Sequence, residues 1–329
     1  TSGTPVCSQT QIGSAIISIA PLPTASISGT ATICSGATTT ITFNGSPNAT
    51  VTYTINSGAN QTIVLDGLGV ASFTTPALTA NTTFALVSVA SSGLPACSQT
   101  LVGSAVITIA PLPTATISGA VTICSGATTT ITFNGTPNAT VTYTINSGVN
   151  QTILLDGSGV ASFTTPALTA NTTYALVSVA SSGIPVCSQT LIGSAVVTVI
   201  QLPTANISGT TTICSGATTT IGFSGTPNAT VTYTINSGVN QTILLDGIGN
   251  ASITTPALIA NSTYTLVSVA SSGLPVCSQA QIGSAIVTVT PLPTASISGT
   301  TAICSGGTTT MSFSGTPNAT VTYTINSGA

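Results

Sequence analysis

The chain has 329 residues, none of which is Lys, Arg or His, and its three acidic residues give a formal net charge of −3. General acid–base catalysis needs a titratable side chain with a suitable pKa. Only Asp66, Asp156 and Asp246 carry a carboxylate, so we predict no enzyme, no catalytic residues and no cofactor. The lack of cations also excludes nucleic-acid binding through phosphate contacts and attraction to anionic lipid.

Mean hydropathy is +0.61, which could indicate a membrane protein. A spanning helix, however, needs about 20 consecutive apolar residues. The apolar runs in this chain are short, and Ser, Thr, Asn or Gly interrupts each one. We therefore predict no membrane insertion in this segment.

A unit of 90 residues recurs along the chain, as the spacing of Cys34, Cys124, Cys214 and Cys304 shows. Near-identical copies at a fixed period are typical of a tandem array. We predict whole repeats at 21–110, 111–200 and 201–290, with the end of a preceding repeat at 1–20 and the start of another at 291–329. Thr1 corresponds to Ser91 and Ala329 to Val239, so we expect a window on a longer chain.

The second copy illustrates the elements of one repeat. Apolar and polar residues alternate along it; Val141 and Tyr143, for example, share a face opposite the intervening threonines, which is typical of half-buried strands. No apolar stripe with helical spacing occurs. In chain order the predicted strands are Ala115–Ser118, Thr128–Phe133, Thr140–Asn146, Gln151–Leu155, Val160–Thr164, Thr173–Ala180 and Ser194–Val199.

Turn residues separate these strands. Gly135–Asn138 predicts a turn, and Asp156–Gly159 predicts a hairpin that joins the fourth strand to the fifth, since Gly supplies the positive φ that tight turns require. Tyr174, at the start of the sixth strand, resembles a tyrosine corner. Phe84 replaces it in the first copy, so the hydroxyl is not essential.

Seven short alternating strands in about ninety residues indicate an all-β fold of tandem immunoglobulin-like sandwiches. Pro-Leu-Pro segments begin the repeats at Pro21, Pro111 and Pro291, with Gln201-Leu202-Pro203 as a variant. Because proline fixes φ and lacks a donor, we expect short, stiff junctions and a linear rod.

The cysteines are the most specific signal. Their periodicity predicts a disulfide framework in an oxidising compartment, whereas the nearest spacing of 27 residues is too wide for typical zinc pairs. No metal site is therefore assigned. The predicted structural disulfide residues are Cys7, Cys34, Cys97, Cys124, Cys187, Cys214, Cys277 and Cys304.

Two pairings of these cysteines are open. One bond within each repeat would join Cys34 to Cys97. In an immunoglobulin-like sandwich, however, those residues lie at opposite ends of the domain, and a disulfide needs Cα atoms within about 7 Å. Head-to-tail neighbours would instead bring Cys34 close to Cys187, and Cys124 close to Cys277. We favour bonds across the junctions, and a loop that folds back would restore the alternative.

Other polar motifs have ordinary interpretations. A calcium site usually has several carboxylates, so the isolated Asp66, Asp156 and Asp246 favour turns. Thr-x-Thr rows such as Thr50/Thr52/Thr54 could bind glycans or ice, although Thr also suits the outer face of an uncharged strand. Sequons such as those at Asn48, Asn81 and Asn171 are expected by chance in this composition.

The combination TATISG, ICSGATTTITF, ATVTYTINSG, TTYALVSVASSGIPVCSQT and PLPTA resembles the immunoglobulin-like repeats of giant surface proteins in gliding Bacteroidetes, the SprB-type adhesins and related type IX secretion cargo. The resemblance covers the whole chain. It implies export, display as filaments on the cell surface, and adhesion or gliding over polysaccharide-rich surfaces. It implies no catalytic or ligand residues in the repeats.

We therefore expect a structural stalk or filament segment of an extracellular, cell-surface adhesin. Alternatives are repeats that themselves bind glycans or ice by avidity, and a self-assembling fibre or sheath. The expected partners are neighbouring repeats of the same chain, lateral copies of itself and surface polysaccharide.

Overall fold

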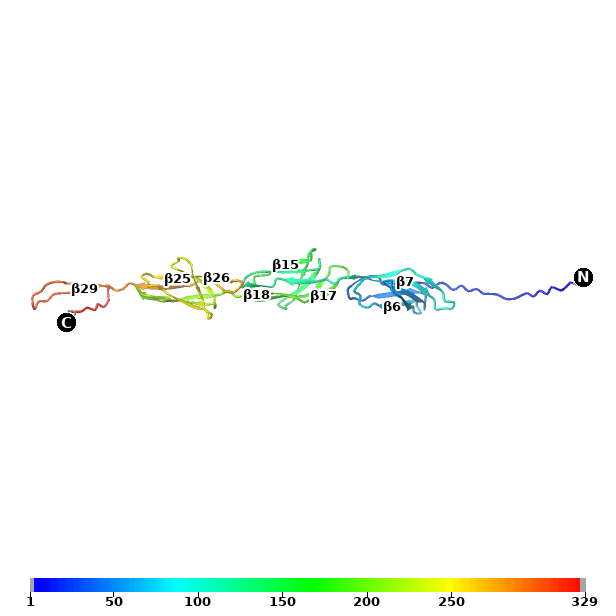
Figure 1. Ribbon diagram of the computed structural model, residues 1–329, viewed down its shortest axis with the longest axis horizontal. Helices are drawn as coiled ribbons and strands as arrows, with labels where there is room; N and C mark the ends of the chain where they lie inside the picture. Colours follow the sequence, from blue (N-terminus) through cyan, green and yellow to red (C-terminus); the bar gives the residue numbers. More distant parts are fainter. Residues whose placement is uncertain (1–2, 326–329) are drawn as a thin grey trace. The chain divides into compact units, whose positions relative to one another are not determined.

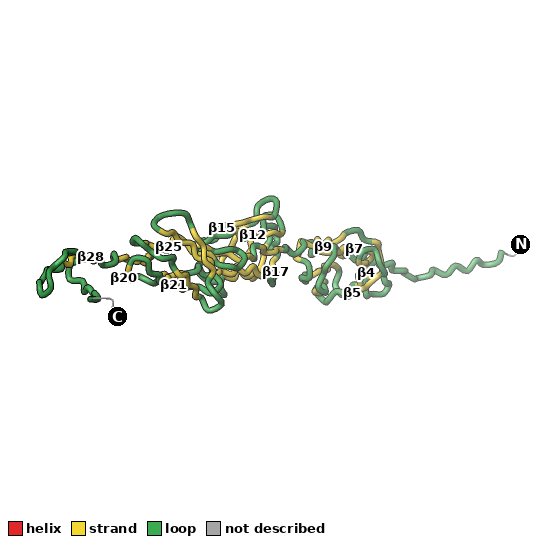
Figure 2. Tube along the Cα trace, turned by 60° about the vertical axis from the view of Figure 1, so that its left-hand side comes forward, coloured by secondary structure: helices red, strands yellow, loops and turns green. Residues whose placement is uncertain are grey.

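The computed structural model describes residues 3–325, and within them every regular element is a β-strand (Figures 1 and 2). The part of the chain that is described holds no helix long and apolar enough to cross a membrane. The first copy contains β1 (Ala25–Ser28), β2 (Ala31–Cys34), β3 (Thr40–Gly45), β4 (Thr50–Ile55), β5 (Asn60–Val64), β6 (Val70–Thr74), β7 (Thr82–Ala90), β8 (Ser98–Thr100) and β9 (Ser104–Ala110).

The same elements return in the later copies. The second contains β10 (Ala115–Ser118), β11 (Val121–Cys124), β12 (Thr130–Gly135), β13 (Thr140–Ile145), β14 (Asn150–Leu154), β15 (Val160–Thr164), β16 (Thr172–Ala180), β17 (Ser188–Thr190) and β18 (Ser194–Ile200). The third contains β19 (Ala205–Ser208), β20 (Thr211–Cys214), β21 (Thr220–Gly225), β22 (Thr230–Ile235), β23 (Gln241–Leu244), β24 (Asn250–Thr254), β25 (Ser262–Ala270), β26 (Ser278–Ala280) and β27 (Ser284–Thr290). β28 (Ala295–Ser298) and β29 (Ser312–Gly315) follow as an antiparallel pair.

Each of the three copies has two sheets. In the first copy one sheet has the order β1-β3-β6, and the other has the order β2-β9-β7-β4-β5 with β8 added to β7. β2 pairs with β9 in parallel, whereas β4 and β7 pair antiparallel. This separation of three strands from a sheet built around β4, β7 and β9 is the arrangement of an immunoglobulin-like sandwich. The predicted all-β, immunoglobulin-like fold is confirmed.

The core lies between the two sheets, where the alternation of the sequence directs the apolar side chains. In the first copy Phe43 and Tyr53 come from different sheets, and their rings lie 5.0 Å apart. Phe73 meets Phe84 edge-on at 5.7 Å. Such aromatic pairs add to the burial of apolar area that drives folding. The intervening threonines face outward, as predicted.

Two elements of the sandwich are missing from the sequence prediction. β11 and β17 are short strands of four and three residues. Neither is long enough to show clear alternation. β11 depends on a neighbour distant in the sequence, since it pairs with β18, whereas β17 pairs with β16, the strand that directly precedes it.

The predicted hairpin at Asp156–Gly159 is wrong. β14 pairs with β13 in the larger sheet, whereas β15 belongs to the sheet of β10 and β12. The turn therefore carries the chain from one sheet to the other. Leu155, which is fully buried, holds the start of this crossover against the core. Gly159 has the positive φ predicted for a tight turn, but the turn residues do not show which strands pair.

The chain divides into two compact units. One comprises Thr1–Ser118, Ile131–Phe163 and Thr173–Ala195, and the other comprises Gly119–Thr130, Thr164–Thr172 and Val196–Ala329. Each unit thus contains one whole copy and part of the middle copy. The predicted boundaries at the Pro-Leu-Pro segments stay a prediction.

Candidate functional site

The first half of the site is a tight turn at the end of β2. Ser35 donates its backbone N–H to the carbonyl oxygen of Ala110 at 2.9 Å, and Gly36 donates to Leu78 at 2.8 Å. Gly36 has φ of 84°, a conformation that favours glycine. Because β2 pairs in parallel with β9, these bonds hold Cys34 beside the end of the last strand of its copy.

The second half is the loop between β16 and β17. Ser181 binds Cys187 twice: its N–H donates to the Cys187 carbonyl at 2.8 Å, and its Oγ accepts the Cys187 N–H at 3.0 Å. The Ile184-Pro185 peptide bond within the loop is cis. In β17, which follows the loop, Gln189 Nε2 donates to the Pro113 carbonyl at 2.6 Å. The two ends of the loop are therefore bonded to each other, and the strand that follows the loop is bonded to the linker before β10.

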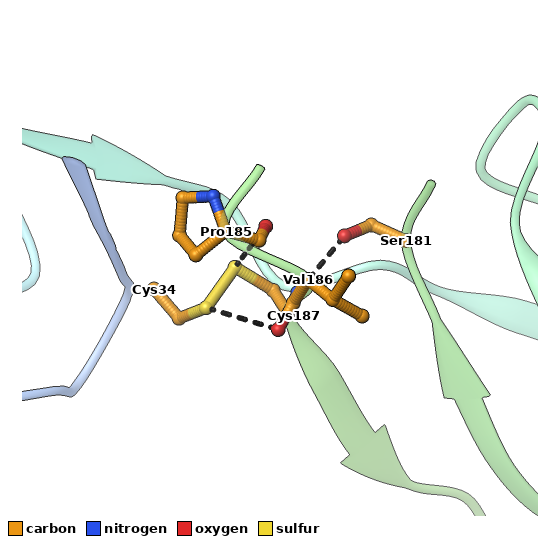
Figure 3. Close-up of a disulfide and its surroundings, with 5 residues drawn as sticks. All are labelled: Cys34, Ser181, Pro185, Val186 and Cys187. Atoms are coloured by element: carbon orange, nitrogen blue, oxygen red, sulfur yellow. Dashed lines mark hydrogen bonds between the residues drawn. A yellow bond between two sulfur atoms is a disulfide. The ribbon is translucent and has the colours of Figure 1, made fainter. Parts of the chain in front are cut away.

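A disulfide joins the turn to the loop (Figure 3). Cys34 and Cys187 have Cα atoms 5.5 Å apart and are separated by 153 residues in the sequence. Cys34 Sγ lies 3.8 Å from the Val186 carbonyl oxygen, and Cys187 Sγ lies 3.7 Å from that of Pro185. Neither sulfur carries a proton, so these are packing contacts. Cys187 is 1% exposed, and the bond is therefore shielded on that side.

A second disulfide of the same kind joins Cys124 to Cys277. The Cα atoms are again 5.5 Å apart, and the sequence separation is again 153 residues. Each bond lies within one of the two compact units. A separation of 153 exceeds the 90-residue period, so each bond links consecutive copies. The pairing that the sequence analysis favours is the one formed, and the bond within a single repeat is not.

The other four cysteines have no disulfide partner among residues 3–325. Cys7, Cys214 and Cys304 are exposed, and Cys97 is half-buried. For these four the predicted structural disulfides stay a prediction. Their positions nevertheless repeat those of the bonded cysteines at the 90-residue period.

Sequence analysis missed the residues that support the disulfides. Ser181, Pro185 and Gln189 belong to the recurring motif SSGxPxCSQ, where the middle positions vary between copies. The recurrence was a usable signal. What it could not indicate is that the serine and glutamine bind the backbone, because those contacts depend on the fold.

The three acidic residues lie in tight turns, where each accepts backbone hydrogen bonds from its own turn. Asp156 Oδ1 accepts the N–H groups of Ser158 at 2.8 Å and Val160 at 2.9 Å, and the Ser158 hydroxyl at 2.6 Å. The Ser158 side chain, followed by these backbone donors, lowers the pKa of the Asp156 carboxyl. Within residues 3–325, no three His, Cys, Asp or Glu side chains gather around a common point. Asp66 and Asp246 accept the same two backbone bonds.

The row Thr50/Thr52/Thr54 lies on β4 in the larger sheet, and its residues alternate with the buried Val51 and Tyr53. Thr52 pairs in register with Thr62 on one side and Ser88 on the other, and Ser88 pairs with Thr100. Four hydroxyl-bearing residues thus cross four strands of the first copy. The same register recurs at Thr142 in the second copy.

Two of the sequon asparagines act within the fold. Asn81 Oδ1 accepts the Ile109 N–H at 2.7 Å, and Asn171 Oδ1 accepts the Val199 N–H at 2.7 Å. Each side chain therefore satisfies a backbone donor of the last strand of its copy. Tyr174 also has a packing role: it is 1% exposed, and its ring meets Phe163 edge-on at 5.7 Å.

No protein-family model matches this chain, and no curated protein matches it. Among solved structures, a marsupial T cell receptor is 11% identical with a TM-score of 0.37, over 79% of this chain and 99% of that chain. A D1–D4 ectodomain fragment of ICAM-5 is 11% identical with a TM-score of 0.37, over 84% and 79%. A trypsin-activated alpha-2-macroglobulin from Escherichia coli is 10% identical with a TM-score of 0.24, over 81% and 23%. The strand order and register define the chain's fold as tandem immunoglobulin-like sandwiches.

Proposed function

We propose that this chain is a structural stalk or filament segment of a long extracellular protein displayed at the cell surface. The observation that carries this proposal is the pair of disulfides that link consecutive copies. A bond between copies adds nothing to an isolated sandwich, but it resists bending and separation in an array. Structural disulfides also favour an oxidising, extracellular compartment.

The composition agrees with a mechanical role outside the cell. Without Lys or Arg, the chain offers no cleavage point to proteases of trypsin specificity. The copies are also nearly identical, whereas domains that bind different ligands would be expected to diverge. In this proposal the repeats supply reach and resistance to force, and they carry no catalytic residue.

The two bonds overlap along the chain, which makes the proposal testable by pulling. The shortest covalent path runs from residue 1 to Cys34, across to Cys187, back to Cys124, and across to Cys277. While both disulfides are intact, the chain can extend over only 148 of its 328 residue-to-residue steps. The remaining 180 steps lie in the loops that the disulfides close, so this hidden length adds to the contour length only after the disulfides are reduced.

Single-molecule force spectroscopy of the full chain, pulled from both ends, measures this hidden length. We expect reduction to add about 650 Å of contour length, at about 3.6 Å per residue. In Cys34→Ser the single remaining bond hides 153 steps, so the hidden length should fall by about 100 Å. Bonds within each repeat would make it fall by about 230 Å instead. No difference between oxidised and reduced chains would contradict the mechanical role.

More specifically, we propose that the chain belongs to an SprB-type adhesin of gliding Bacteroidetes, on the basis of the resemblance in repeat style. Under this assignment the filament carries an adhesive part elsewhere and acts in attachment or gliding. Immunogold labelling of the source cells with antibodies against residues 111–200 tests it. Label along surface filaments is expected, and label confined to the cell interior would contradict it.

A second candidate function is binding of surface polysaccharide, and the hydroxyl row through Thr52 favours it. Several weak sites, one on each copy, would add through avidity. The full chain should then bind a glycan array, and replacing Thr52, Thr142 and Thr232 by Val should abolish that binding. Retention of binding in the variant would exclude the threonine row as the binding site.

The third possibility, a self-assembling fibre, requires lateral self-association of the chain. Sedimentation of the same samples at several concentrations tests it, because self-association makes sedimentation depend on concentration.

A further inference from the structure

The loop that ends at Cys97 has the same internal bonds as the two loops that hold a disulfide. Ser91 Oγ accepts the Cys97 N–H at 3.0 Å, as Ser181 and Ser271 do for Cys187 and Cys277 at 3.0 and 2.9 Å. The three loops therefore have one geometry, and Cys97 holds its place without a partner.

The hydrogen bond from the glutamine after the loop to the proline linker also recurs in each copy. Gln99 Nε2 donates to the Pro23 carbonyl at 2.6 Å, which matches the bond from Gln189 to Pro113 and that from Gln279 to Pro203. The linker and the loop are thus joined in the same way in all three copies.

What differs is exposure. Cys187 and Cys277 are 1% and 0% exposed, whereas Cys97 is half-buried. Pro95 is exposed, whereas Pro185 and Pro275 are half-buried. Beside Cys97 lies an open cavity of about 350 Å³, lined among others by Pro21, Leu22, Ser46, Leu94 and Pro95. Leu22, which is 57% exposed, presents an apolar surface in this cavity.

The turn that contains Cys214 is equivalent to the bonded turns, and Cys214 has no disulfide partner among residues 3–325. The turn after Cys214 has Gly216 at φ of 86°, against 84° and 87° for Gly36 and Gly126 in the bonded turns. Ser215 donates to the Thr290 carbonyl at 2.9 Å, as Ser35 does to Ala110. The geometry of a bonded turn therefore does not depend on the disulfide.

We propose that the Cys97 loop and the Pro21–Thr24 linker form an acceptor site for the Cys-Ser-Gly turn of a further tandem repeat. This inference rests on the proposed tandem array. The occupant is a repeat of the same type that precedes residue 21 in the same polypeptide. Its turn cysteine and Cys97 form a disulfide. The two thiols lose two protons and two electrons to a small-molecule disulfide, which is reduced to two thiols.

The test extends the full chain by one repeat. A second copy of residues 21–90 placed before Thr1 completes a repeat, because Thr1 corresponds to Ser91. The Cys34 of the added copy then precedes Cys97 by 153 residues, the separation of both observed bonds. Both chains are oxidised with glutathione disulfide, labelled with N-ethylmaleimide and digested with chymotrypsin for mass spectrometry.

We expect Cys97 to be labelled in the original chain. In the extended chain it should lose its labelling and appear joined to the Cys34 of the added copy. The matched control replaces that added cysteine by Ser and should restore labelling of Cys97. Cys97 that stays labelled while Cys34–Cys187 and Cys124–Cys277 form would overturn the acceptor site. Bonding of Cys97 to another cysteine, or to a second molecule, would also overturn it.

The two native disulfides report folding of the extended chain. If they do not form, the complementary variant appends residues 240–290 after Ala329, which places a copy of Cys277 153 residues beyond Cys214. Cys214 must then be joined to that cysteine, and a free Cys214 would overturn the site. Failure of the acceptor site leaves the mechanical proposal intact, because the pulling experiment measures only the two native bonds.

Discussion

Cys34 and Cys187 lie 5.5 Å apart between Cα atoms although 153 residues separate them along the chain. One belongs to a turn that follows a short parallel strand, and the other to a loop on the next copy. The closer cysteine in sequence, Cys97, is on the same copy as Cys34 and is not its partner. The sandwich places the Cys34 turn and the Cys97 loop at opposite ends of one copy. Each cysteine can therefore bond only to a cysteine of a neighbouring copy.

Removing the first disulfide should destabilise the chain. The closed loop of 153 residues corresponds to about 5 kcal/mol in the chain-entropy account, as an upper value. We expect Cys34→Ser with Cys187→Ser to lower the denaturant midpoint of the oxidised protein and to leave the reduced protein unchanged.

The matched control for this variant is Cys214→Ser, which changes the equivalent turn where no disulfide is present. Its denaturation curve should overlay that of the native chain. Equal midpoints for the double variant and the native chain under oxidising conditions would show that the bond does not stabilise the fold.

Asp156 should make stability depend on pH. Its folded pKa is lowered, first by the Ser158 hydroxyl and then by backbone donors. A lowered folded pKa stabilises the fold above the unfolded pKa near 4, and this stabilisation is lost as the pH falls through the folded pKa. Thermal melting of Asp156→Asn between pH 7 and 2 should show a flatter acid limb than the native chain.

Ser158→Ala is the companion variant for this carboxyl. Without the hydroxyl bond, the Asp156 pKa should move back toward its ordinary value, and NMR titration of the carboxyl carbon measures it. An unchanged pKa in Ser158→Ala would contradict the assigned cause.

Gly159 should not tolerate a side chain. Its φ is 80°, and an added Cβ would collide with the backbone carbonyl oxygen of Gly135. We expect Gly159→Ala to cost about 2 kcal/mol or more, from positive φ and from the clash. Gly157→Ala, two residues earlier, meets no atom within 4 Å and should be near neutral. Similar urea midpoints for the two variants would contradict the turn geometry.

Tyr174 should act through its ring. Phe84 occupies the equivalent place in the first copy and is equally buried. Tyr174→Phe should therefore change stability by less than about 1 kcal/mol, whereas Tyr174→Ala should cost about 3–5 kcal/mol through the cavity that it leaves. Chemical denaturation measures both. A large loss in Tyr174→Phe would show that the hydroxyl has an essential partner.

The strand pattern was readable from the sequence wherever alternation was long enough to be seen. β13, with buried Val141 and Tyr143 between threonines, is an example. β11 was missed because four residues cannot establish a period, and its pairing is with β18 far along the chain. The Asp156 turn was recognised by its residue types, but the sheet to which the next strand belongs is a long-range property.

By itself the sequence determined the 90-residue period, the all-β class and the limits on chemistry that follow from the absence of Lys, Arg and His. Those properties depend on composition and local alternation, which a chain carries before it folds. Only the tertiary structure decided that Cys34 bonds to Cys187 and not to Cys97, and that β15 leaves the sheet of β14. Both outcomes depend on which distant segments pack together, because a disulfide or a strand pair forms only where folding brings the backbones within a few ångströms.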